Sequence, residues 1–415
     1  MKFLYISSFC LLFYVMASCS NKQVTFYHSE DEILEGCTVI NISDIKDSSV
    51  IACSDIFSEV EYIPLEDTFN STVGMIEKLA VTPDGDMIVF DRRNGIIVRY
   101  NRDGHYMNKI GERGHQKNEY VRPIDIAYDP YNKQVIVWDN VRKALLYYDI
   151  KGNLVNKKES EQWHGTLEVL DSNSIAVCKS YEIKDRPYSF KYFIMDRNGK
   201  IKKEFDEYNT ITEFQRSSNR IFSKCDGKLL CHTEYSSNIF ELRNDSLVPR
   251  YHLSFGKNGI PEDWFGYNED KFRKMLHRNK NTTYCTRFFE AKRCFVTTIC
   301  RDFLYLCIKD KEEYGGKVHA GYNLRNDLCG IKVIDEAGGI MNMPTVLPLT
   351  VDNGICYFEV EPSLFATFTA NLKNIKKQLE SNRQYKGEGI DDKDIRKFEL
   401  LSENNNPIIV KCTLK

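Results

Sequence analysis

The sequence lacks a strong excess of charge of either sign. Lys and Arg number 57 against 59 for Asp and Glu, which gives a formal net charge of −2 at pH 7. This balance provides no general attraction to a polyanion, so we expect no nucleic-acid partner. Beyond its N-terminal segment, the chain also lacks an apolar run long enough to span a membrane. We therefore expect no membrane-spanning helix in the mature protein.

Short motifs that carry chemistry are missing as well. The 14 cysteines include no C-x-x-C pair, and the eight histidines include no H-x-H or H-E-x-x-H pattern, so nothing predicts a metal site. No Ser, Cys or Thr lies in a G-x-S-x-G context, which would identify a hydrolase nucleophile. We therefore predict no cofactor and assign no catalytic residue.

The cysteines are numerous but irregularly spaced, which argues against a disulfide framework. Cys294 and Cys300 lie in CFVTTIC, where equal parity places both on one face of a strand. A cysteine in this setting acts as a small core hydrophobe. One or two disulfides are the alternative.

The N-terminus has the features of a secretory signal. Lys2 is followed by an apolar run from Phe3 to Val15, and small residues precede Cys19. This ending resembles a bacterial lipobox, so we predict a signal peptide over 1–18, lipidation at Cys19 and a tether over 19–54. An ordinary signal peptide is the alternative. We expect attachment to the outer membrane, facing the periplasm, with the cell surface as the second choice.

A repeat of 48 residues organises the rest of the chain. VFDRRNGIIVRYNRDGHYMNK (89–109) aligns without gaps with VWDNVRKALLYYDIKGNLVNK (137–157). Two weaker copies, YFIMDRNGKIKKEF and NIFELRNDSLVPRYHL, follow at similar spacing. Each copy contains alternating apolar strands joined by a Gly- or Asn-containing turn, and a further strand precedes each copy. Four strands in every 46 to 48 residues predict the blades of a β-propeller.

Counting these units predicts one all-β domain over 55–415, a six-bladed β-propeller of four-stranded antiparallel blades. Helical insertions are expected near 261–281 and 361–383. The strand Ser58–Glu66 has no partner nearby in sequence, so we predict that it pairs with Ile408–Leu414 and closes the ring.

The order EYIPLE, IEKLAVTPDGDMIVFD, IGERGHQKNEY, IDIAYDP and terminal NPIIVKCTLK resembles the bacterial six-bladed β-propeller lipoproteins, which are related to NHL-repeat propellers. The family pattern before the second blade is close to G-x-x-G-x-G-P-x-E-Y. This chain keeps Gly111, Gly114, Glu119 and Tyr120 but has Gln116–Asn118 where Gly and Pro are usual. The resemblance implies location and shape more than a particular activity.

The stretch GERGHQKNEYVRP (111–123) suggests a phosphate loop, but a strand rather than a helix follows it. We interpret it as the crossover between two blades. Such crossovers lie at the rim of a propeller face near the central channel, so its polar and aromatic residues are candidate ligand contacts. These residues are Arg113, His115, Glu119, Tyr120 and Arg122.

Three aspartates require separate interpretations. Asp91 and Asp139 resemble paired catalytic carboxylates, but they are equivalent positions of the repeat, so we predict that they bind turn N–H groups. Asp327 is not repeated and lies in the polar loop NLRNDLCG. It is therefore a further candidate for ligand binding.

Together these features predict a monomeric, lipid-anchored binding module that recognises a small ligand, a glycan or peptide fragment, or an envelope protein. The competing hypothesis is a propeller hydrolase, lactonase-like or glycan-cleaving, with its site at the central channel. Only under that hypothesis do we expect a Ca²⁺ ion, held by oxygen ligands from several blades.

Overall fold

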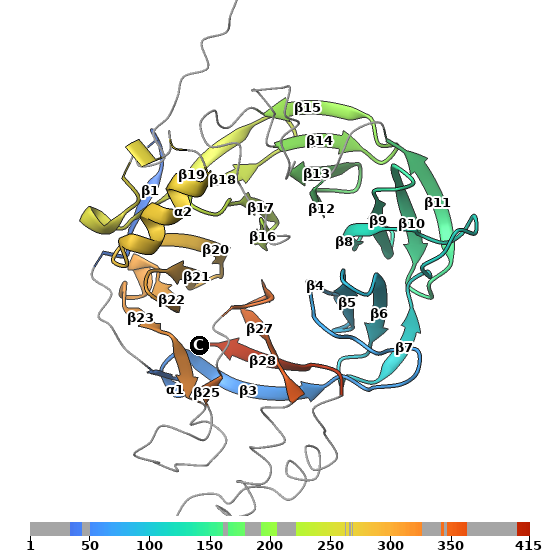
Figure 1. Cartoon of the computed structure of the whole chain (residues 1–415), viewed down its shortest axis with the longest axis horizontal. Helices are drawn as coiled ribbons and strands as arrows, with labels where there is room; N and C mark the ends of the chain where they lie inside the picture. The colour runs from blue at the N-terminus through green and yellow to red at the C-terminus, as the bar shows by residue number, and fades with distance from the viewer. Residues whose placement is uncertain are drawn as a thin grey trace, which may run out of the picture.

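The computed structural model is a ring of β-sheets around a central axis (Figure 1). It describes residues 34–43, 50–160, 165–178, 192–205, 221–261, 263–264, 267, 269–325, 342–343, 347–362 and 405–415. Six four-stranded antiparallel sheets are the blades, which confirms the predicted six-bladed propeller. In each blade the first strand lies nearest the axis and the fourth lies at the rim.

The first three blades follow the chain without interruption by other strands. From axis to rim they are β4 (Lys78–Val81), β5 (Met87–Asp91), β6 (Ile96–Tyr100) and β7 (Tyr106–Lys109); β8 (Pro123–Asp129), β9 (Gln134–Asp139), β10 (Ala144–Asp149) and β11 (Leu154–Glu159); and β12 (Thr166–Val169), β13 (Ser174–Cys178), β14 (Tyr192–Asp196) and β15 (Ile201–Phe205).

The next two blades carry additional elements at the rim. Their strands are β16 (Phe222–Cys225), β17 (Lys228–Cys231), β18 (Asn238–Leu242) and β19 (Leu247–Ser254), then β20 (Tyr284–Glu290), β21 (Cys294–Cys300), β22 (Leu304–Asp310) and β23 (Val318–Gly321). Strand β1 (Thr38–Asn41) adds in parallel to β19. A small separate sheet contains β2 (Val50–Ala52), β24 (Asn323–Arg325) and β25 (Asn342–Met343).

The sixth blade combines the two ends of the chain. Its strands are β26 (Thr350–Asp352), β27 (Ile355–Val360), β28 (Ile408–Leu414) and β3 (Phe57–Pro64). Strand β28 pairs antiparallel with β3, in a register that places Val410 opposite Tyr62. The predicted closure of the ring by the terminal strands is therefore confirmed. The β3–β28 ladder joins the two ends of the domain within one blade.

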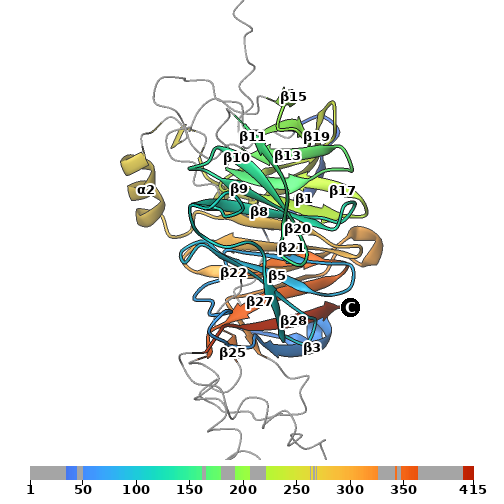
Figure 2. The same ribbon diagram turned by 90° about the vertical axis from the view of Figure 1, so that its right-hand side faces the viewer.

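Helices are few. The helix α2 (Glu269–Arg278) lies in the connection between the fourth and fifth blades and projects from one face of the ring (Figure 2). The other helical elements are α1 (Cys53–Ile56), η2 (Gly256–Asn258) and η4 (Glu312–Tyr314). Most of the second expected insertion, 361–383, lies outside the described residues. Within the described ranges, no helix is both long and apolar enough to cross a bilayer.

The central strands of a blade bury both of their faces, because each blade packs between two neighbours. In β5, Met87 and Val89 pack toward the sixth blade, whereas Ile88 and Phe90 pack toward the second. All five residues of this strand are buried. The alternation predicted from the repeat is therefore wrong for β5: the strand is buried on both faces and is a continuous apolar run up to Asp91.

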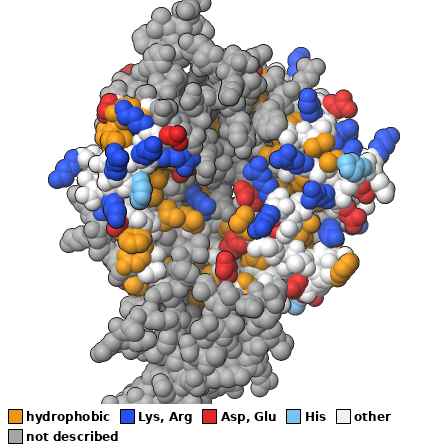
Figure 3. All heavy atoms as spheres, viewed as in Figure 1, with side chains coloured by type: hydrophobic (Ala, Val, Ile, Leu, Met, Phe, Trp, Pro, Cys, Tyr) orange, Lys and Arg blue, Asp and Glu red, His pale blue; other side chains and the backbone are white. Residues whose placement is uncertain are grey.

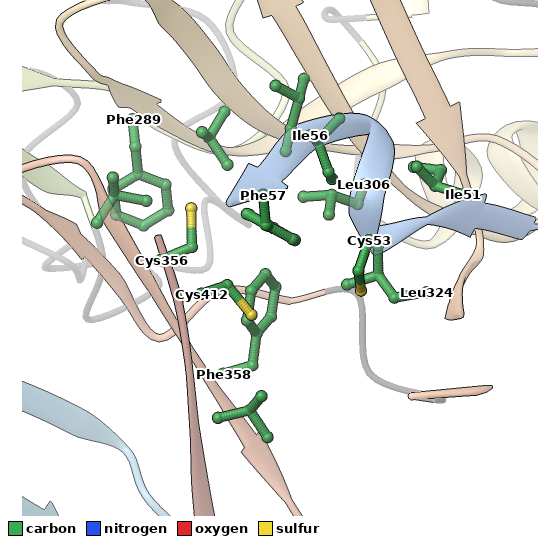
Figure 4. Packing of buried hydrophobic residues seen from close by; sticks show 14 of the residues in the cluster. Ile51, Cys53, Ile56, Phe57, Phe289, Leu306, Leu324, Cys356, Phe358 and Cys412 are labelled. Atoms are coloured by element: carbon green, nitrogen blue, oxygen red, sulfur yellow. The ribbon is translucent and has the colours of Figure 1, made fainter. Parts of the chain in front are cut away.

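One of the inter-blade cores joins the N-terminal segment to the sixth blade (Figure 4). Phe57 and Phe358 meet edge to face with ring centroids 6.4 Å apart. Cys53, Cys356 and Cys412 are buried in the same cluster as free thiols, and burial raises the pKa of Cys356 and of Cys412 well above the usual value. Un-ionised buried thiols act as small apolar side chains.

The predicted packing role of cysteine is confirmed for Cys294, which is buried in this cluster. Cys300 shares its strand but is only half-buried and belongs to no core cluster.

The repeated turn glycines connect neighbouring blades. Gly104 and Gly152 both have positive φ, of 88° and 89°. A Cβ atom at Gly104 would lie 2.3 Å from the carbonyl oxygen of Pro64, and one at Gly152 would lie 2.2 Å from that of Lys109. Each glycine thus lets its turn contact the last residue of the preceding blade's outer strand, so the 48-residue repeat marks the contact between blades as well as the turn.

The Gly152→Ala variant is expected to lose about 2 to 4 kcal/mol of unfolding free energy, because the new methyl group meets backbone and the positive φ is strained. Gly227→Ala is the matched control: Gly227 has a φ of 74° and nothing within 4 Å of its Cβ position. It should lose only about 1 kcal/mol. Urea unfolding of both variants measures the difference, and equal losses would show that the inter-blade contact contributes nothing.

Candidate functional site

A cavity of about 250 Å³ lies on the axis of the propeller. All six inner strands contribute to its wall. The turns that follow three of these strands also border it, through Pro83, Pro130 and Asn353. These turns lie on the face opposite the crossovers between blades, so the cavity is displaced toward that face. Its other lining residues are Lys78, Leu79, Ala80, Val81, Tyr128, Glu168, Phe222, Ser223, Lys224, Phe289, Leu349, Thr350, Val351 and Asp352.

Lys78 connects the inner strands of three blades. Its ammonium group lies 3.0 Å from Asp125 Oδ2, on β8, and donates to the carbonyl oxygen of Leu167, on β12, at 2.9 Å. The backbone N–H of Leu167 donates to the same Asp125 oxygen at 2.8 Å. Inner strands of neighbouring blades share no ladder, so these polar contacts hold the axial wall together.

A second lysine continues the charge array around the axis. Lys224 Nζ, on β16, lies 2.8 Å from Glu168 Oε1, and Lys78 Nζ lies 3.8 Å from Glu168 Oε2. Burial favours the neutral form of Glu168, but the ammonium groups of Lys224 and Lys78 outweigh it and lower the pKa of that carboxyl. The side chain of Lys224 is 41% exposed, so its charge can reach a ligand in the cavity.

Asp125 is the most strongly perturbed member of the array. Its side chain is fully buried, and this burial raises the pKa of the carboxyl to about 6, although Lys78 and the Leu167 N–H favour the charged form. Within the described part of the chain, Asp125 Oδ1 and the nearby Thr166 Oγ1 are buried without a hydrogen-bond partner. The carboxyl of Asp125 therefore titrates near neutral pH next to the cavity.

The remaining lining residues give the cavity an apolar side and a second carboxylate besides Glu168. Phe222 and Phe289 come from β16 and β20. Asp352, at the end of β26, is half-buried, and this burial raises its pKa although Asn353 and Lys224 lower it. The cavity thus presents ammonium groups, carboxylates and aromatic surface together, which suits a small ligand carrying both charges and an apolar group.

The predicted crossover residues lie elsewhere. The crossover folds back on itself, since Arg113 and Tyr120 form a parallel bridge and the Gln116 N–H donates to Glu119 Oε2 at 2.8 Å. Tyr120 is only 1% exposed and contacts Tyr148 edge to face. Its ring therefore belongs to the core between the first two blades, where it cannot contact a ligand from solvent.

The other candidates differ in exposure. Arg113, His115 and Arg122 are exposed on the crossover face. Glu119 is half-buried and borders a separate cavity of about 310 Å³ at the rim. None of these four lines the axial cavity. Asp327 and Cys19 lie outside the described residues.

The repeated aspartates bind backbone N–H groups, as predicted. Asp91 accepts from Gly74 N at 2.8 Å and from Asn94 N at 2.9 Å. Asp139 accepts from four N–H groups in the equivalent loops, those of Val121, Arg122, Val141 and Arg142. Both carboxylates tie the loop after the second strand to the crossover that enters the same blade, so they serve the fold and not catalysis.

Sequence reasoning missed the axial charges. Lys78, Asp125, Glu168 and Lys224 each stand within the inner strand of one of four successive blades. The signal in the sequence is one or two charged residues inside short apolar segments, IEKLAV, PIDIAY, TLEVL and IFSKC. A charge at the same place in successive repeats points to the axis, because that is where the inner strands converge.

A family model described as "Domain of unknown function (DUF4934)" matches residues 37–413. No curated protein matches this chain in sequence. Among solved structures, a Bacteroides fragilis protein whose name describes it as exported superimposes with a TM-score of 0.67 at 14% identity, covering 91% of this chain and all of that one. A DUF4221 protein from Bacteroides vulgatus has a TM-score of 0.48 at 10% identity, covering 86% of this chain and 97% of its own. At these identities the first structure supports the propeller fold and nothing more.

Proposed function

The chain belongs to the DUF4934 family, and we propose that it is a lipid-anchored envelope protein that binds a small zwitterionic ligand, such as a peptide fragment, in its axial cavity. The observation that supports this function is the array of ammonium and carboxylate groups from the inner strands of several blades around one cavity. The N-terminal signal with Cys19 and the exported protein of similar fold support the location. We place the anchor in the outer membrane, with the domain facing the periplasm.

The two charge signs favour a peptide over a neutral glycan. Lys224 offers an ammonium group to a ligand carboxylate, and Asp352 offers a carboxylate to a ligand ammonium. Phe222 and Phe289 supply apolar surface for a side chain. A neutral sugar would offer no opposite charge to the half-buried Asp352 carboxylate, and this costs binding free energy.

Binding fits the site better than metal-dependent hydrolysis. A Ca²⁺ site needs six to eight oxygen ligands, several of them carboxylates free to coordinate. Glu168, which lines the cavity, and Asp125, which is buried behind Lys78, are each paired with lysine. Among the described residues, no group of three or more His, Cys, Asp and Glu side chains is placed to hold a metal. We therefore favour recognition over the hydrolase alternative.

Thermal unfolding with a panel of dipeptides, tripeptides and neutral oligosaccharides tests this function. A peptide at about 100 times its Kd should raise the Tm of the wild type by about 2 °C or more. Lys224→Met should lose most of this rise, because the ammonium that pairs with the ligand is gone. Lys157→Met is the control, since Lys157 forms a comparable ion pair with Glu159 on an outer strand.

The proposal is wrong if no peptide raises the Tm, or if Lys224→Met responds as the wild type does. A rise with oligosaccharides alone would make the ligand a glycan. Cleavage of a panel member, followed by mass spectrometry, would make the protein a hydrolase.

A further inference from the structure

The crossover face carries a concentration of cations over the first two blades. Five basic side chains are exposed there, and we call them the basic surface. They are Arg93, Arg113, Lys117, Arg122 and Lys143. Figure 3 shows this face, on which α2 also projects. Lys and Arg side chains lie over its right half, with hydrophobic, Asp and Glu side chains among them, and further Lys and Arg side chains lie over its left half.

Contacts between loops make the basic surface continuous. Arg113 reaches the loop of the first blade, where its Nη1 lies 3.5 Å from the carbonyl oxygen of Asn94. Arg142 reaches back from the loop of the second blade and donates to the carbonyl oxygen of Gln116. The three loops 92–95, 113–122 and 140–143 therefore form one surface rather than three separate tips.

The five cations of the basic surface outnumber the carboxylates of the same loops, where Glu112, beside Arg113, is exposed and Glu119 is half-buried. In the described part of the chain, no ion pair joins any of its five members to a carboxylate. The nearest buried acids, Asp91 and Asp139, are occupied by backbone N–H groups, and Glu119 accepts from Gln116 N. Because the chain as a whole has a net charge of −2, this positive face is a local feature and not a consequence of composition.

Exposed apolar side chains stand beside these cations. Phe69 is 100% exposed at the tip of a turn in which Ser71 N donates to the Thr68 carbonyl oxygen at 2.9 Å. Met75 is 49% exposed in the same crossover, next to the loop of the first blade, and Val141 is 56% exposed within the loop of the second. Asn70, adjacent to Phe69, lines the rim cavity together with Glu119 of the neighbouring crossover.

We propose that this face docks on a membrane surface that carries anionic headgroups. Cations with interspersed apolar groups are the composition that binds the interface of a bilayer, because the cations attract phosphate and the apolar groups enter the headgroup region. An acidic polysaccharide would match the cations but would leave Phe69 without a partner.

Docking through this face would orient the domain with its axial cavity away from the membrane. This consequence rests on the proposed function. The axial cavity lies toward the opposite face, where Pro83, Pro130 and Asn353 border it. Docking through the crossover face therefore leaves the cavity open to the aqueous side. The docking itself is independent of any ligand.

Hydrogen–deuterium exchange of the mature full-length protein tests the docking. We expect phosphatidylglycerol–phosphatidylcholine vesicles to slow exchange about tenfold in 66–75, 92–95, 113–122 and 140–143, whereas pure phosphatidylcholine vesicles do not. Arg93→Glu/Arg113→Glu/Arg122→Glu should abolish this protection. Phe69→Ser should weaken it without affecting the attraction of the cations.

A triple variant on the opposite face is the matched control, because it changes the net charge equally. Its exposed members are Arg102, Lys133 and Lys292, each replaced by Glu. It should keep the protection, and the thermal melting of both triple variants shows that they are folded. The proposal is overturned if vesicles give no protection, protect both faces equally, or protect the Arg93→Glu/Arg113→Glu/Arg122→Glu variant as well as the wild type. Equal protection by dextran sulfate without vesicles would also overturn it. Lys224→Met should leave the protection unchanged, so failure of docking and failure of ligand binding are distinguishable.

Discussion

Replacing Asn406 by leucine is expected to lower the free energy of unfolding by about 3 to 5 kcal/mol. Asn406 precedes β28 and is 1% exposed. Its side chain accepts from Val73 N at 2.7 Å and donates to the Ser71 and Glu66 carbonyl oxygens at 2.7 and 2.9 Å. Leucine has a similar size but leaves these backbone groups buried and unpaired at the point where the ring closes.

The measurement is urea unfolding, with Asn156→Leu as the control. Asn156 is exposed on the outer strand β11, where its Oδ1 accepts only a local N–H. Its replacement should change stability by less than about 0.5 kcal/mol. A loss of similar size in both variants would mean that the closure of the ring does not depend on Asn406.

Replacing Lys78 by methionine should cost about 3 to 5 kcal/mol at pH 8, because it leaves the carboxylate of Asp125 buried without its cation. At pH 5 the loss should be much smaller. Burial already raises the pKa of Asp125 from 3.8 to about 6, so the folded state favours the protonated carboxyl. The stability that this protonation contributes is fully present below about pH 4 and is lost as pH rises through 6.

Urea unfolding at both pH values measures this dependence. The double variant Lys78→Met/Asp125→Asn should recover most of the stability lost at pH 8, since it removes the unpaired charge. Equal losses for Lys78→Met at pH 5 and pH 8, or no recovery in the double variant, would show that Asp125 is not the group that Lys78 compensates.

The sequence predicts the architecture well because a repeat exposes it. The 48-residue spacing between Gly104 and Gly152 indicates the number of residues in a blade. A strand without a local partner at each end of the domain predicts closure through β3 and β28. Both features are local patterns, and the structure that they predict depends little on contacts between residues distant in sequence. The resemblance to propeller lipoproteins also implies a location in the cell envelope. That location remains a proposal, because Cys19 lies outside the described residues.

The site is harder to predict, because it is formed by strands far apart in sequence. Within a single repeat, nothing distinguishes a charge that faces the axis from one that faces solvent. Lys78 and Asp125 stand out only when successive repeats are compared, and their pairing is seen only in the assembled ring. The reverse holds for Tyr120, which follows a polar loop yet packs against Tyr148 of another strand. Tyr120, one of the candidate ligand contacts, is therefore a core residue.

The most direct test of the central claim, that the axial cavity binds a zwitterionic ligand, is the rate at which an amine-specific reagent modifies Lys224. With the most stabilising peptide at about ten times its Kd, this rate should fall about tenfold, because the bound ligand occupies the ammonium group. The rate at Lys157, on the outer strand β11, should not change. An unchanged rate at Lys224, at peptide concentrations that raise the Tm, would place the ligand elsewhere and contradict the account.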